Sequence, residues 1–124
     1  MAFPLSTLSQ PEYWIMKRFR IGNDILITWS VKKKGAPAEL VGKDIKVYLS
    51  HEKGREVIAH KLINGNTIEI LFEGLKQSVL GKYTITIDAR EQTSRYLIQD
   101  KCNAFELVGR SCAEESEADY ILNL

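Results

Sequence analysis

Two glutamates, Glu69 and Glu73, have the spacing that most resembles a catalytic pair of carboxylates. On an extended strand, residues four apart project from the same face, and a glycosidase needs two carboxyl groups flanking the bond it cleaves. The same spacing is more often found on the solvent face of a half-buried strand. We therefore assign no catalytic role to this pair and expect both side chains to face solvent.

The histidines and cysteines complete the set of residues that could do chemistry. His51 adjoins a glycine-containing turn and is expected in an exposed loop, and neither it nor His60 belongs to a hydrolase or zinc motif. Cys102 could act as a thiol nucleophile, but such a cysteine is usually a small buried apolar residue. Cys102 and Cys112 are too few for a disulfide scaffold, so reduced thiols are expected, although one bridge between them is sterically feasible. We predict a protein that is not an enzyme, with no cofactor and no metal.

The elements that would position these residues are strands. From Gly81, a glycine turn leads into a segment in which Tyr83, Ile85 and Ile87 share one face, as in a half-buried antiparallel strand. The order Gly-x-Tyr before a late strand is typical of the tyrosine corner of immunoglobulin-like sandwiches, whose hydroxyl bonds to the preceding loop. Ile85 stands where a true immunoglobulin domain has a cysteine, so no inter-sheet disulfide is expected.

Comparable alternation recurs along the chain, with turn signals between the segments. Trp29 alternates with aliphatic residues and is expected in the core, and Phe105 is expected to have a structural role near the end of the sequence. The pattern predicts an all-β fold, an immunoglobulin-like antiparallel β-sandwich of about eight strands. The expected strands cover 13–19, 25–31, 44–50, 56–63, 67–73, 81–87, 95–100 and 103–108, and a short helical turn covers 74–80.

The composition is that of a single globular domain. The chain has 124 residues, of which 44% are hydrophobic and 27% charged, and its formal net charge is +1. These values exclude disorder and give no general attraction to nucleic acid. The N-terminus lacks the basic and apolar regions of a signal peptide, and no stretch has the length of a membrane span. We expect synthesis in the cytoplasm, no membrane insertion and no nucleic-acid partner.

The two ends of the chain differ from its centre. Residues 1–112 are predicted to form one β-sandwich domain with an extended N-terminal arm, and residues 113–124 an acidic linker with an apolar, strand-like tail. Such a tail tends to pair with a sheet edge, either in its own protomer or in a neighbour. The ends therefore supply the candidate interface residues, which are Tyr13, Trp14, Tyr120, Ile121, Leu122 and Leu124.

Several short phrases occur together in an order shared with a known family. They are FRIGNDI at 19–25 with WSV at 29–31, GKDIKVYL at 42–49, LGKYT at 80–84 and DKCNAFELV at 100–108. Over residues 15–112 the chain resembles the N-terminal β-sandwich domain of Bacteroides-type prophage and phage tail or baseplate proteins. That domain is itself similar to the N-terminal domain of the upper baseplate proteins of lactococcal phages.

The resemblance implies a non-enzymatic structural module that docks a fibre or receptor-binding element onto the phage tail. The implied partners are other tail or baseplate proteins and further copies of the chain, and the implied location after synthesis is the virion. The alternative is a carbohydrate-binding or adhesion module on the same sandwich. An exposed aromatic residue such as Trp14 can stack on a sugar ring of a host-surface glycan or anchor a protein interface.

Overall fold

The chain folds as an all-β sandwich. The structure, a computed structural model, describes residues 16–110 and 120–124, so Tyr13, Trp14 and Cys112 lie outside the described part of the chain. No helix in the described part is long and apolar enough to cross a membrane. The elements are β1 (Lys17–Arg20), β2 (Ile25–Ser30), β3 (Lys32–Lys33), β4 (Ala36–Pro37), β5 (Asp44–His51), β6 (Gly54–Ile58), β7 (Lys61–Asn64), β8 (Thr67–Phe72), the short 3-10 helix η2 (Gly74–Lys76), β9 (Gly81–Glu91), β10 (Ser94–Val108) and β11 (Tyr120–Asn123).

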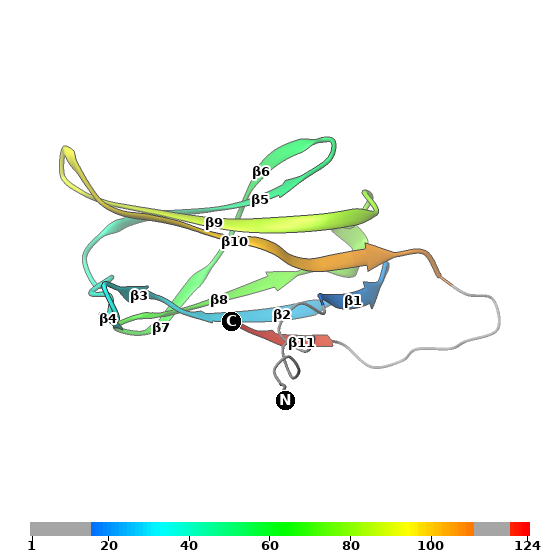
Figure 1. The fold of residues 1–124 in the computed structure, drawn as a ribbon, viewed down its shortest axis with the longest axis horizontal. Helices are drawn as coiled ribbons and strands as arrows, with labels where there is room; N and C mark the ends of the chain where they lie inside the picture. The colour runs from blue at the N-terminus through cyan, green and yellow to red at the C-terminus, as the bar shows by residue number, and fades with distance from the viewer. Residues whose placement is uncertain (1–15, 111–119) are drawn as a thin grey trace, which may run out of the picture.

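Two sheets form the layers of the sandwich. Sheet A has the strand order β1-β10-β9-β5-β6, and sheet B has the order β11-β2-β8-β7. Figure 1 shows β9 and β10 of sheet A lying over β2 and β8 of sheet B, with the short β3-β4 pair at one end. The apolar side chains of the two inner faces form one core cluster.

Alternation along β2 explains which face of this strand is buried. Ile25, Ile27 and Trp29 are at most 1% exposed, whereas the residues between them are half-buried. β-Branched and aromatic side chains suit a pleated surface, and the period of two places them on one face. Trp29 therefore lies in the core, where it pairs in register with Ile68 of β8.

A tyrosine ties the loop before β9 to the sandwich. Tyr83 is 1% exposed and donates its hydroxyl to the carbonyl oxygen of Val79 at 2.6 Å. Its ring stacks on Phe105 of β10, with centroids 4.9 Å apart and an interplanar angle of 7°. Burial, with a smaller contribution from the carboxylate of Glu56, raises the pKa of Tyr83 to about 12. The bond to Val79 is the contact with the preceding loop that the Gly-x-Tyr pattern predicts.

A set of hydrogen bonds from Gln77 and Asp24, which we call the turn clamp, joins the turn before β2 to the turn after β8. The side chain of Gln77 donates to the carbonyl oxygen of Asn23 and accepts from the N–H of Gly22, both at 2.8 Å. Asp24 accepts a hydrogen bond from the N–H of Gly74 at 2.7 Å. A Cβ atom at Gly74 would overlap the backbone of Gly22, so the turn clamp requires glycine at this position. These contacts join turns about fifty residues apart, a separation that local sequence patterns do not encode, so the sequence alone does not predict them.

The first and last described strands each form the edge of a sheet, and both run parallel to their neighbour. β1 pairs with the end of β10, and β11 pairs with β2. Phe19 of β1 and Leu122 of β11 are 5% and 3% exposed, so the tail strand pairs within its own protomer. The sequence predicted antiparallel strands throughout. Parallel pairing arises at these edges because long connections, rather than tight hairpins, bring the strands together.

The segment 56–63, which was predicted as one returning strand, is two strands in different sheets. β6 forms a hairpin with β5 in sheet A, and β7 pairs with β8 in sheet B. The chain crosses from one sheet to the other at Ala59 and His60, which belong to neither strand. Alternation specifies the face of a strand but not its sheet, so the crossing was not predictable from periodicity.

Near the C-terminal end of the sandwich, two segments predicted as separate strands are joined into one. The segments 95–100 and 103–108, which were predicted as separate strands, form the single long strand β10. Its pairing with β9 is irregular between Lys101 and Phe105, where Asn103 has a φ of 51°. This irregularity explains the break in the sequence pattern, because a bulge shifts the alternation without ending the strand.

Candidate functional site

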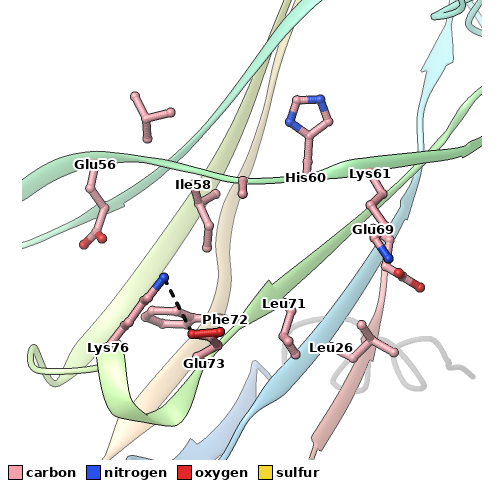
Figure 2. A pocket seen from close by; sticks show the side chains of 12 residues that line it. Leu26, Glu56, Ile58, His60, Lys61, Glu69, Leu71, Phe72, Glu73 and Lys76 are labelled. Atoms are coloured by element: carbon pink, nitrogen blue, oxygen red, sulfur yellow. Dashed lines mark ion pairs between the residues drawn. The ribbon is translucent and has the colours of Figure 1, made fainter.

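A pocket of about 460 Å³ opens where the chain crosses from sheet A to sheet B. Glu69 and Glu73, the glutamates considered as a catalytic pair, both line it. Figure 2 shows Glu56 and Ile58 of β6, just before the crossing, pointing toward β8 on the other side of the pocket. The other lining residues are Leu26, Val57, Ala59, His60, Lys61, Leu71, Phe72 and Lys76.

The pocket has apolar walls and a charged rim. Phe72 is 2% exposed, and Ile58 packs against the core as a half-buried residue. Leu71 and Val57 are 49% and 64% exposed. Apolar walls with a few polar groups are typical of ligand pockets. The arrangement is suited to holding an apolar group beside a charged one.

The carboxylates of the rim each lie near a basic side chain. Glu73 Oε1 is 3.6 Å from Lys76 Nζ, the ion pair drawn as a dashed line in Figure 2. Glu56 Oε2 is 3.1 Å from His51 Nε2, and Glu69 stands opposite Lys61 in the β7-β8 register. Glu69 and Glu73 are half-buried. They therefore lie in the wall of a pocket, where the sequence predicted an ordinary solvent face.

His51 was wrongly predicted to be an exposed loop residue. It ends β5, its side chain is 9% exposed, and its ring lies 5.3 Å from that of Tyr83. The hairpin that returns β6 along β5 brings Glu56 onto the imidazole, and Nδ1 accepts the N–H of Lys53 at 3.2 Å. His60, in the crossing segment, has its pKa lowered by burial. Figure 2 shows its ring pointing away from β8.

Cys102 was wrongly predicted to be buried. It is a free, exposed cysteine in the irregular part of β10. The next residue, Asn103, donates its N–H to Thr84 Oγ1 at 3.1 Å and has a left-handed backbone, so the regular alternation is lost here. Within residues 16–110 and 120–124, no three histidine, cysteine or carboxylate side chains are grouped so as to hold a metal ion.

An apolar row crosses the outer face of sheet B. Ile121 of β11, Leu26 of β2 and Leu71 of β8 are direct register partners, and we call these three residues the apolar row. Neighbouring strands lie about 5 Å apart, so the three side chains are adjacent. Ile121 and Leu71 are 62% and 49% exposed, and Leu26 is half-buried. The row is continuous with the pocket because Leu26 and Leu71 line both.

The candidate interface residues of the tail are placed on both faces of β11. Tyr120 packs on Phe19 with ring centroids 4.7 Å apart, and Leu122 is buried. Leu124 is half-buried and donates its N–H to the carbonyl oxygen of Thr28 at 2.7 Å. Ile121 points outward into the apolar row. From the sequence, only the alternation of side chains along the tail could have shown which of these residues are buried and which are exposed.

The comparisons with known proteins add little to this geometry. No protein-family model matches the chain, and no curated protein matches its sequence. Among solved structures, the chain is similar to the crystal structure of a "putative glycoside hydrolase" from Bacteroides vulgatus ATCC 8482, with a TM-score of 0.47 and 9% identity over 78% of this chain. The chain spans 17% of the length of that protein. Likeness at this level carries no inference about activity.

Proposed function

We propose that the chain is a non-enzymatic assembly module that associates with a second copy of itself through the outer face of sheet B. The apolar row is the observation that carries this proposal, because it places three apolar side chains side by side on three neighbouring strands. Contiguous apolar side chains at the surface of a folded domain mark sites of protein association.

The residues beside the apolar row suit a contact between copies. The next outward-facing positions on the same three strands are Asn123, Thr28 and Glu69, which are also direct register partners. Thr28 Oγ1 donates to Asn123 Oδ1 at 2.6 Å. An apolar strip bordered by a polar one reproduces the core and rim of a protein interface. Two such faces related by a two-fold axis would bring one apolar row against the other.

The finer proposal is a structural role in the tail or baseplate of a phage or prophage. It is supported by the sequence phrases at 19–25, 42–49, 80–84 and 100–108, which resemble the corresponding domain of such proteins. The partners would be other tail proteins in addition to copies of this chain, and the location would be the virion. The module would then dock receptor-binding elements onto the tail.

Light scattering on purified protein tests the association. The wild-type chain should form a dimer, and Ile121→Lys should be monomeric because a charge in the apolar row must be desolvated when the two faces meet. Val41→Lys is the matched control, since Val41 is 68% exposed and does not belong to the apolar row. A monomeric wild-type protein at high concentration, or a dimer that persists in Ile121→Lys, would contradict the proposal.

A further inference from the structure

The second half of β8 has a strand partner on one side only, within the described residues. β8 pairs with β2 along its whole length, but its register with β7 ends at Lys61 opposite Glu69. Continued for two residues, that register would place Ala59 opposite Leu71. The chain instead leaves sheet B, and Ile58 pairs in sheet A. The edge of sheet B at Leu71 is therefore the wall of the pocket.

The backbone groups of Leu71 face this pocket. The carbonyl oxygen of Phe72 accepts from Gln77 Nε2, and the N–H of Gly74 donates to Asp24. Gln77 also bonds to Asn23, so these contacts lie on the β2 side of the strand. Successive residues of an antiparallel strand direct their N–H and C=O groups to opposite sides. Leu71 therefore presents one donor and one acceptor to the pocket.

The side chains around Leu71 define what a strand in the pocket would carry. A residue opposite Leu71 shares its outward face, and the same face holds Glu69 two residues before and Glu73 two residues after. Diagonal neighbours across a pair of strands are within reach of long side chains. The residues flanking that position would point inward, toward Phe72 and Ile58.

The charge of the rim favours a cation at the central position. Three carboxylates and two lysine ammonium groups line the pocket, and burial lowers the pKa of His60, which keeps its imidazole neutral at neutral pH. Lys76 is already paired with Glu73. Lys61 stands opposite Glu69, so the carboxylate in excess of the lysines is Glu56 of β6, which points across the pocket toward β8 in Figure 2.

We propose that the pocket binds an extended segment of a partner protein, which adds to the edge of β8 with a lysine or arginine opposite Leu71 and an apolar residue on each side of it. Backbone hydrogen bonds to Leu71 would hold the segment, and the alternating side chains would select it, as in other cases of strand addition to a sheet edge. This site goes beyond the proposed self-association, which uses the side chain of Leu71 in the apolar row, whereas strand addition uses the backbone N–H and C=O of Leu71.

A capped pentapeptide, Thr-Val-Lys-Val-Thr, tests the proposal in an NMR titration of the full chain. Amide shifts should concentrate at Ala59 and at Leu71 with its neighbours. Methylating the backbone nitrogen of the lysine should weaken binding by about tenfold, because it removes a hydrogen bond to Leu71. Replacing the lysine with glutamate should weaken binding by about fivefold or more.

Variants of the protein locate the site. Ala59→Trp should abolish binding, because Ala59 is exposed in the pocket wall and an indole there fills the space. Val41→Trp, at an exposed position outside the pocket lining, should bind as the wild type does, and Ile121→Lys should also bind, which separates this test from that of self-association.

Three results would overturn the proposal. The first is no shift at millimolar peptide. The second is equal binding by the methylated or the glutamate peptide, which would exclude strand addition or charge selection. The third is a set of shifts in residues 1–15 when Ala59→Trp is introduced without peptide, which would make the chain's own arm the occupant of the pocket.

Discussion

The two lateral sides of the sandwich are finished in different ways. On one side β1 and β11 complete sheets A and B, and each buries one side chain, Phe19 and Leu122 respectively. On the other side no side chain of β6 or β7 is fully buried, and Ile58 and Leu62 are only half-buried where they pack against the core. We call these the closed side and the open side. The closed side contributes apolar burial to stability, whereas the open side leaves the edge of β8 accessible at the pocket.

Aromatic contacts reinforce the closed side. Phe19 lies 4.7 Å from Tyr120 and 5.9 Å from Phe105, measured between ring centroids. Phe105 stacks in turn on Tyr83, whose ring is 5.6 Å from that of Phe72 at the pocket. These pairs link β11, β1, β10, β9 and β8, so the edge strands of the closed side share one packed cluster. Edge strands of similar length can thus contribute to stability or leave a sheet edge free for binding. Which of the two they do depends on whether their inward side chains pack into the core.

Phe19→Ala should have the largest effect on stability. Truncating this buried ring removes its packing against Phe105 and Tyr120 and should lower the free energy of unfolding by about 3–5 kcal/mol. Val57→Ala on the open side is the control and should change it by less than about 0.5 kcal/mol, because Val57 is 64% exposed. Urea denaturation measures both. Equal losses in the two variants would remove the distinction between the sides.

Leu122→Ala tests the contribution of the tail strand. Its side chain is 3% exposed, and its loss should cost about 2 kcal/mol, near the lower end for a buried leucine because β11 is an edge strand. Ile121→Ala, one residue earlier on the outer face, should cost less than about 0.5 kcal/mol in dilute protein, where self-association does not contribute. A larger loss in Ile121→Ala would place the buried face of β11 on the wrong side.

Tyr83→Phe should lower the free energy of unfolding by about 1 kcal/mol, because the carbonyl oxygen of Val79 loses its donor. Thermal melts of the variant and the wild type measure this loss. An unchanged melting temperature would show that the hydroxyl bond contributes nothing.

The same tyrosine predicts a pH dependence. Its pKa rises from 10.0 to about 12 in the folded chain. Above pH 10 the unfolded chain therefore loses the phenol proton before the folded chain does. The contribution of the protonated phenol to the free energy of unfolding is complete below pH 10 and is lost as the pH approaches 12. The difference in stability between wild type and Tyr83→Phe should accordingly narrow over this range. A difference that stays constant would contradict the burial of the phenol.

His60→Gln should have the smallest effect. Burial lowers the pKa of His60 below 6.5, so the unfolded chain takes up this proton first as the pH falls below that value. The contribution of the neutral His60 imidazole to the free energy of unfolding is present above pH 6.5 and is lost on acidification. His60→Gln should therefore lose less stability than the wild type between neutral and mildly acidic pH. An equal loss of stability in the two proteins on acidification would contradict this account of the open side.

The parts of the fold that could be predicted from the sequence depend on local patterns. Trp29 was predicted in the core because strand alternation has a period of two, and Tyr83 was predicted to bond to its preceding loop because a glycine turn introduces it. Both predictions agree with the burial and the hydrogen bond in the structure. The all-β sandwich follows from the same patterns repeated along the chain.

The parts that could not be predicted depend on contacts between distant segments. The crossing at Ala59 and His60 changes sheets without changing the alternation, and the pocket exists only because of that crossing. His51 is covered by the side chain of Glu56, and Cys102 is exposed by an irregular register. Turn and strand propensities carry no information on such pairings.

Native-state hydrogen exchange, measured by NMR in dilute protein, tests the difference between the two sides most directly. The amide of Leu122 on β11 and that of Ile21, which donates to the carbonyl oxygen of Val108 at 3.0 Å, should exchange slowly. The amide of Leu71, which faces the pocket, should exchange faster by about a hundredfold or more. Protection of Leu71 equal to that of Leu122 would contradict the account, because the edge of β8 would then not be open to a partner.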